Sequence, residues 1–206
     1  EAIKLLKENS ITKFNETLDV AINIAIDTKK TDQNVRGVID LPYGTGKKVI
    51  VAVIAKGDSA KDAKNAGADL VGDNDLAENI SKGKIDFNLL ITTPDMMPVI
   101  GKLGKILGPK GLMPNPKLGT VTQDISTAVK KAKAGQVQYK NDKAGIIHAG
   151  VGKLDFKDEN LFDNLKTFYQ AVLKSKPDTA KGSFIKKVTI ASTMGFGLEV
   201  NVGELR

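Results

Sequence analysis

The spacing of hydrophobic residues changes twice along the chain, and this constrains the fold more than any other feature of the sequence. From Leu18 to Ile26 every second residue is large and apolar, which is typical of a strand with one buried face. From Val49 to Ala55 the residues are apolar without a break, as in a strand buried on both faces. After Gly135 the alternation returns. The pattern predicts a body built from both chain ends with an α/β domain inserted into it.

The remaining elements follow from the same periodicities. In the middle of the chain we expect helices over 59–66, 75–82, 95–107 and 124–134, and strands over 69–71 and 87–92, the alternation of parallel βαβ units. After them we expect strands over 136–140 and 145–149, an amphipathic helix over 158–175, and closing strands over 184–190 and 198–202. Glycines mark the two joints, at Gly44–Gly46 and at Gly135, and two adjacent linkers predict a hinge.

The composition narrows the functional classes. The chain has 31 Lys and Arg against 24 Asp and Glu, a formal charge of +7, with no Cys and a single His. Disulfides, thiolate catalysis and zinc–thiolate sites are therefore excluded. No apolar run approaches the ~20 residues of a membrane helix, and no signal peptide is evident, so we expect a cytoplasmic protein trimmed or truncated before Glu1.

The positive charge gathers in the middle and the C-terminal part of the chain. Residues 1–44 are net −1, residues 45–136 net +5 and residues 137–206 net +3. Lysines gather over 102–117, 130–143 and 174–187, with few acids among them. A single lysine most often only solvates the surface. Three such clusters favour an anionic partner, nucleic acid before a membrane surface.

Enzyme signatures are missing. In Gly44-Thr45-Gly46-Lys47, the glycine and hydroxyl residue that complete a phosphate-binding loop are replaced by Leu41 and Lys48. No strand–turn–helix junction carries the dinucleotide fingerprint, and no metal-ligand cluster is evident, so we expect no cofactor. His148 stands in a short apolar strand, where a buried or RNA-facing structural role is more frequent than a general base.

Three segments carry features of a binding surface. Residues 107–117 combine three prolines with two glycines, which indicates a shaped exposed loop, either a structural connection or a binding surface. Residues 192–195 combine hydroxyls, a thioether and a glycine, which suit close approach of RNA but equally a polar turn. Residues 13–17 place Lys13 beside Phe14, which can stack on a base or pack in the core.

Taken together, these segments resemble the ribosomal protein L-one family, of bacterial type. The strongest stretch is ILGPKGLMPNPKLGT at 106–120, and the stretches at 12–20, 32–47, 141–153 and 181–197 follow in the family's order. The resemblance covers essentially the whole chain. It implies an α/β fold: a discontinuous α+β RNA-binding domain over 1–45 and 136–206, with a Rossmann-like three-layer α/β domain over 46–135 inserted between them.

The resemblance also implies two sets of site residues. The main rRNA contact consists of Lys13, Phe14, Glu16, Thr17, Thr193, Met194 and Gly195, with Lys143 and Lys186 as further members, and Glu16 accepting hydrogen bonds from ribose hydroxyls. A secondary RNA contact loop contains Lys110, Gly111, Met113, Asn115 and Lys117. Two departures stand out: Phe196 and Ala191 occupy positions where the family usually has Pro and often has Ser. The family's basic stretch before Glu1 is also missing.

The function implied is that of a structural, non-catalytic constituent of the large ribosomal subunit. It would bind large-subunit rRNA at the mobile stalk, contact other large-subunit components, and assist release of exit-site tRNA. It would also repress translation by binding its own mRNA leader, and be monomeric when free of the ribosome. The alternative is a phosphate- or nucleotide-binding enzyme that uses the inserted domain, which rests on fold analogy alone.

Overall fold

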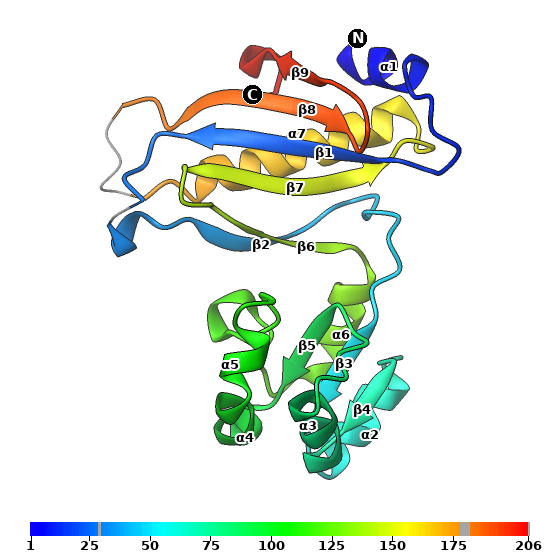
Figure 1. Cartoon of the computed structure of the whole chain (residues 1–206), viewed down its shortest axis with the longest axis vertical. Helices are drawn as coiled ribbons and strands as arrows, with labels where there is room; N and C mark the ends of the chain where they lie inside the picture. The colour runs from blue at the N-terminus through cyan, green and yellow to red at the C-terminus, as the bar shows by residue number, and fades with distance from the viewer. Residues whose placement is uncertain (29, 178–181, 206) are drawn as a thin grey trace. The chain divides into compact units, whose positions relative to one another are not determined.

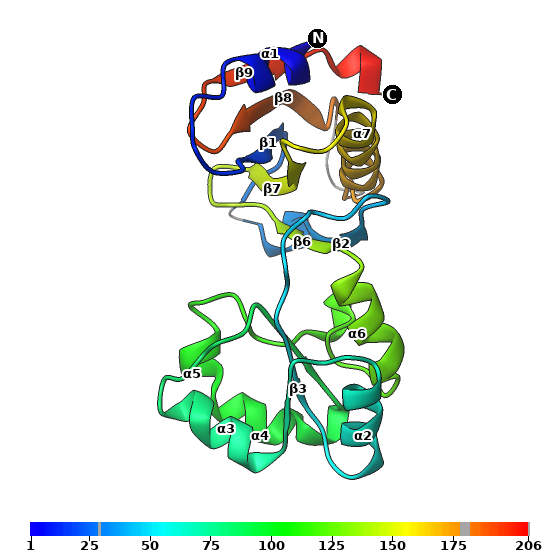
Figure 2. The same ribbon diagram turned by 90° about the vertical axis from the view of Figure 1, so that its right-hand side faces the viewer.

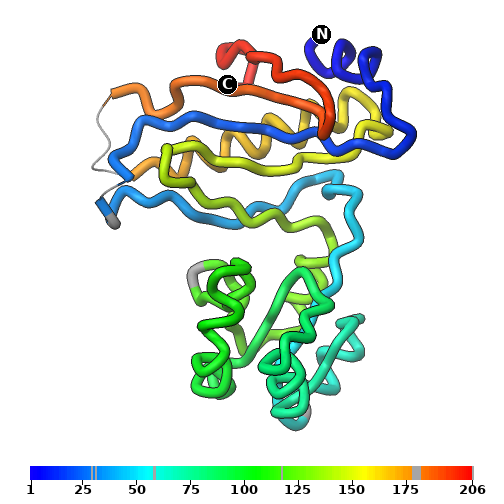
Figure 3. Tube along the Cα trace, viewed as in Figure 1, coloured from blue at the N-terminus to red at the C-terminus, as the bar shows by residue number. Residues whose placement is uncertain are grey.

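The computed structural model describes residues 1–28, 30–177 and 182–205, and it divides the chain into two compact units. The first comprises Glu1–Lys47 and Gly135–Arg206, and the second comprises Lys48–Ala134. The chain trace leaves the first unit once and returns to it once (Figure 3). The boundaries expected from the sequence lie at 45/46 and 135/136, within two residues of these.

The first unit is built around an antiparallel sheet with the order β7-β1-β8-β9. Its strands are β1 (Thr17–Ile24), β7 (Ile146–Lys153), β8 (Ile185–Ser192) and β9 (Gly197–Val200). A separate ribbon pairs β2 (Arg36–Asp40) with β6 (Gln136–Lys140). The helices are α1 (Ala2–Glu8) and α7 (Asp158–Lys174), with single 3-10 turns at Thr31–Gln33 and Val202–Leu205.

One face of this sheet carries the core. The alternate residues of β1, Leu18, Val20, Ile22 and Ile24, are buried against α7, whose apolar stripe includes Leu161, Leu165, Phe168 and Val172. Phe168 also meets Tyr139 of β6 edge to face, with ring centroids 5.5 Å apart. Figures 1 and 2 show α7 along one face, and no helix of the described residues lies along the other. The half-buried strand predicted from the alternating pattern is therefore confirmed, and the residues between the buried ones, Thr17, Asp19, Ala21 and Asn23, form an open face.

The second unit has three layers. Its parallel sheet, in the order β4-β3-β5, contains β3 (Val51–Ile54), β4 (Leu70–Gly72) and β5 (Leu89–Thr92). Helices α2 (Asp58–Asn65) and α6 (Ile125–Lys133) pack on one face, and α3 (Asn74–Ser81), α4 (Met97–Lys102) and α5 (Gly104–Leu107) pack on the other. Every residue of β3 is buried, as the unbroken apolar run predicts. The α/β fold class is confirmed.

The structure differs from the sequence-based expectation in a few elements. The single helix expected over 95–107 is a 3-10 turn at Pro94–Met96 followed by two short helices that meet at Leu103. Pro98 and the glycines at 101 and 104 weaken a continuous helix there. The last strand ends at Val200, so Val202 belongs to the terminal 3-10 turn. Helix α1 and strand β2 were not predicted.

The linker that leaves the first unit is tied to its core by one buried amide. Asn164 of α7 is fully buried, and its Nδ2 donates to the carbonyls of Gly44 at 2.9 Å and Val151 at 2.8 Å. Its Oδ1 accepts the N–H of Tyr43 at 3.2 Å. Gly135 passes so close that a Cβ there would lie 2.4 Å from the Cα of Gly44. Only glycine fits at this crossing of the two linkers.

Candidate nucleic-acid interface

A segment from the N-terminal part of the chain and one from the C-terminal part meet at one end of the four-stranded sheet. The loop before β1 and the turn between β8 and β9 lie side by side there (Figure 1), because Leu18 pairs with Ser192 in the sheet. Thr193 makes two of the hydrogen bonds that join them: the N–H of Thr17 donates to Oγ1 of Thr193 at 3.0 Å, and that hydroxyl faces the carbonyl of Thr17 at 3.4 Å. Residues predicted from segments 176 positions apart therefore form one surface.

The carboxylate of Glu16 holds this surface together. Its Oε1 accepts from the hydroxyls of Thr12 at 2.6 Å and Ser10 at 3.1 Å, and its Oε2 faces the N–H of Met194 at 3.4 Å. The hydroxyl of Ser192 also donates to it, and these hydrogen bonds, that of Ser192 first, lower the pKa of Glu16 to about 2. We call this arrangement, Glu16 with its four donors, the Glu16 clamp.

The clamp corrects the role expected for Glu16. Only 2% of this residue is exposed, and its oxygens are occupied by donors of the protein itself. A ribose hydroxyl has no access to a carboxylate that is buried and already satisfied. Glu16 therefore positions the two segments, and the surface they present lies around it.

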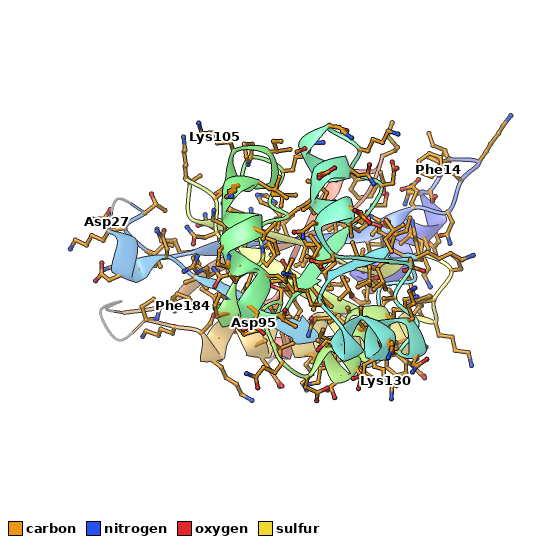
Figure 4. All side chains as sticks on the ribbon, turned by 90° about the horizontal axis from the view of Figure 1, so that it is seen from below. Phe14, Asp27, Asp95, Lys105, Lys130 and Phe184 are labelled. Carbon is orange, nitrogen blue, oxygen red and sulfur yellow. The ribbon has the colours of Figure 1, made fainter. Side chains whose placement is uncertain are left out.

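The side chains next to the clamp point into solvent. Phe14 is 56% exposed and Met194 is 71% exposed, while Lys13 and Phe196 are exposed as well. Phe14 is thus not a core residue, and Figure 4 shows it at the opposite end of the unit from Asp27 and Phe184. Exposed apolar side chains grouped beside a lysine provide a face on which unstacked bases can stack while phosphate meets a cation.

Gly195 lets the turn close over the clamp. A Cβ on this residue would lie 2.3 Å from Oγ of Ser192, the hydroxyl that donates to Glu16. An alanine would therefore push that donor out of place. Gly195 was predicted as an RNA-contact residue. The structure gives a second explanation for a glycine here, since a side chain would displace the hydroxyl of Ser192.

Two predicted site residues lie elsewhere in the first unit. Lys143 is in the turn before β7, and Lys186 is near the start of β8, whereas the clamp lies where β7 and β8 end. At ~3.3 Å per residue, both are about 20–25 Å from the clamp along the strands. Both are exposed, so they form a separate part of the surface and do not join the main set.

The proline-containing loop, residues 107–117, belongs to the second unit. Lys110 and Gly111 are exposed, and Gly111 has a φ of +71°. Leu112 and Met113 pack back on the core beside α3 and α4, so Met113 is only partly available. The N–H of Asn115 donates to Thr120 Oγ1 at 2.8 Å. Lys117 lies in a 3-10 turn, and its side chain is outside the part of the chain that the structure describes.

Sequence reasoning missed the residues that support the site. Ser10, Thr12 and Lys153 were not singled out, and Ser192 was noted only as part of the turn over 192–195 and not as a contact residue. All but Ser10 lie in the stretches that carry the resemblance. Lys153 pairs with Thr17 across the sheet, and its Nζ donates to Thr17 Oγ1 at 2.9 Å and to the carbonyl of Asn15 at 3.2 Å. No spacing rule links residues so far apart in sequence, and only the strand register reveals them.

Comparison with known proteins decides the family. A model described as the Ribosomal protein L1p/L10e family matches residues 6–196. The chain belongs to this family. It is 55% identical over 205 residues to the large ribosomal subunit protein uL1 of Vibrio vulnificus (strain YJ016), covering 100% of this chain and 88% of that protein. It is also 55% identical over 205 residues to the protein of the same name from Actinobacillus succinogenes, covering 100% of this chain and 90% of the relative.

Membership settles the choice between the two classes of function. Members of this family are ribosomal proteins and structural components, so the chain is not an enzyme. The alternative of a phosphate- or nucleotide-binding enzyme is wrong. The Gly44–Lys47 segment agrees with this, since it leads into β3 rather than into a helix whose N-terminus could receive a phosphate. Within the described residues, no helix is both long enough and apolar enough to span a bilayer.

Proposed function

We propose that this chain is a structural constituent of the large ribosomal subunit, within the bacterial cytoplasm, and that it binds large-subunit rRNA through the surface around the Glu16 clamp. Family membership and the names of its relatives support the first part. The observation that carries the second part is the clamp itself. The hydrogen bonds of Glu16 fix the loop before β1 and the turn between β8 and β9 in one arrangement. The exposed apolar and cationic side chains of these two segments are therefore held in fixed positions.

The chemistry of the surface suits a folded RNA with unstacked bases. The ring of Phe14 offers a stacking platform, and Met194 has a flexible thioether that adapts to an irregular surface. Lys13 supplies a cation for phosphate, while Thr193 and the backbone around Gly195 approach the sugar closely. Because the loops are held before RNA arrives, little ordering entropy is lost on binding.

The finer assignments rest on the family resemblance. The rRNA partner is the mobile stalk, and the second unit moves at the glycine linkers as the stalk assists release of exit-site tRNA. The net +5 charge of residues 45–136 supports contact of that unit with tRNA or rRNA phosphates. The same surface of the first unit binds the leader of the chain's own mRNA and represses its translation, and the free protein is monomeric.

The test compares three RNAs at one salt concentration: an rRNA fragment that carries the stalk region, the mRNA leader, and an unrelated duplex. We expect the first two to bind at least ~10³-fold more tightly than the duplex, the lower end of specific over non-specific recognition. Equal affinity for all three would show that bulk charge alone drives binding, and this would overturn the proposal. Loss of only the leader complex would leave rRNA binding intact and remove the repressor role.

A further inference from the structure

Met194 is the most exposed sulfur-containing residue of the chain. The four methionines, at positions 96, 97, 113 and 194, all lie among the described residues, and the sequence has no cysteine. Met194 is 71% exposed, whereas Met96 is 1% exposed and Met97 is half-buried. Met113 is partly buried against the core of the second unit. A reagent that attacks sulfur therefore meets Met194 first.

The Glu16 clamp keeps this side chain at the surface. Met194 lies in the turn between β8 and β9, and its N–H faces Oε2 of Glu16 at 3.4 Å. Before it, Thr193 is bonded to the first residue of β1. After it, the N–H of Gly195 donates to the carbonyl of Ser192 at 3.3 Å. Because the backbone is held on both sides, the turn cannot refold to bury the thioether.

A thioether differs from the other groups of this surface in its reactivity toward oxidants. A hydroperoxide transfers one oxygen atom to the sulfur: an S–O bond forms, the O–O bond breaks, and hydrogen peroxide leaves as water. The lone pair of the sulfur supplies the two electrons that reduce the peroxide. The product, methionine sulfoxide, is polar and chiral, and methionine sulfoxide reductases return it to the thioether.

Oxidation at this position works against RNA binding. The thioether of Met194 offers an adaptable apolar contact in the same exposed group as Phe14. The sulfoxide replaces it with a polar oxygen that must lose its water when RNA covers it. The three hydroxyls of the clamp cannot satisfy that oxygen, because all of them already donate to Glu16. The sulfoxide oxygen also brings partial negative charge to a surface that receives a polyanion.

We propose that Met194 is an oxidation-sensitive switch: its conversion to the sulfoxide by a hydroperoxide keeps the free protein from binding rRNA tightly, and reduction restores binding. The inference rests on the proposed rRNA-binding function and adds a regulation of that same surface. RNA that covers the turn shields the thioether from the oxidant. Oxidation therefore acts on the free protein and prevents new complexes from forming.

The experiment treats the free protein with hydrogen peroxide, removes the peroxide, and measures the affinity for the rRNA stalk fragment at fixed salt. Mass spectrometry of the peptides gives the oxidation rate at each methionine. We expect residue 194 to gain one oxygen atom first, and the affinity to fall at least ~10-fold in step with it. Methionine sulfoxide reductases for both sulfoxide epimers should restore the affinity.

Met194→Leu and Met97→Leu form a matched pair, since leucine resists oxidation and keeps a similar apolar volume. Each variant is compared with itself before and after peroxide, and circular dichroism shows that the fold is retained. Treatment should leave the affinity of Met194→Leu at its own starting value and weaken Met97→Leu as it weakens wild type. In the complex, saturating rRNA fragment should slow the oxidation of Met194 more than that of Met97.

The outcomes separate this inference from the proposed function. Full oxidation of Met194 with unchanged affinity would overturn the switch, as would faster oxidation of another methionine or an equal loss of affinity in treated Met194→Leu. If untreated Phe14→Ala still binds more weakly than untreated wild type in those cases, the rRNA site stands without the switch. If the untreated protein binds the fragment no better than an unrelated duplex, the proposed function fails and the switch fails with it.

Discussion

Replacing Asn164 should lower the stability of the first unit by a measurable amount, because its side-chain amide makes three hydrogen bonds. Asn164→Leu substitutes an apolar side chain of similar shape and removes three hydrogen bonds, to Tyr43, Gly44 and Val151. The carbonyl of Val151 is left buried without this donor, which costs about 1–3 kcal/mol. The two linker groups are partly buried and regain water, so each loses about 0.5–1 kcal/mol. The free energy of unfolding should therefore fall by about 2–5 kcal/mol.

Tyrosine fluorescence during a urea titration measures this change in the right unit. The chain has no Trp, and its three tyrosines, at positions 43, 139 and 169, all lie in the first unit. Amide hydrogen exchange at Tyr43 gives a second reading, because loss of the bond to Asn164 should speed its exchange. Asn9→Leu is the control, since it removes one exposed hydrogen bond and should cost less than about 1 kcal/mol. A loss no larger than that of this control would refute the reasoning.

Three further predictions concern the RNA surface. The pKa of Glu16 is lowered to about 2 from 4.5, so its contribution to stability is complete above pH 4.5 and is lost as the pH falls toward about 2. Glu16→Gln should remove that part of the acid sensitivity in a thermal-melt series, and an unchanged profile would contradict the clamp. Gly195→Ala should displace the Ser192 hydroxyl and weaken rRNA binding roughly 10-fold, and wild-type affinity would count against this geometry. Lys110→Ala with Lys117→Ala should mainly reduce the salt dependence of binding, by ~0.7–0.9 in slope for each phosphate that the protein no longer neutralises, and an unchanged slope would exclude a phosphate-binding role for these lysines.

The architecture could be predicted because burial leaves a periodic signal in the sequence. Alternation from Leu18 onward and the unbroken run through β3 distinguish a half-exposed strand from a fully buried one. Strand β2 has no such signal, because its two end residues are exposed and the three between them are all half-buried, without alternation. Helix α1 buries only Ile3 and Leu6, too few for a recognisable stripe.

The sequence indicated several residues that the structure brings together, but not what each of them does there. The resemblance indicated Glu16 and Thr193, but the role of Glu16 depends on which donors surround it, and those come from both ends of the chain. Asp19 gives a second example. In sequence it is one polar residue of an alternating strand, and only the register shows that it lies between the small residues Gly150 and Ala191.

The central claim is that rRNA binds at the surface around the Glu16 clamp, and the affinities of three variants for the rRNA stalk fragment test it most directly. Phe14→Ala removes the stacking platform, and Thr193→Ala removes the hydroxyl that joins the two segments. Phe162→Ala is the matched control, an aromatic residue of α7 that is 37% exposed and takes no part in the site. We predict that the first two variants bind at least ~10-fold more weakly, about 1.4 kcal/mol, while the control binds like wild type. Wild-type affinity in both site variants, with the fold intact, would contradict the account.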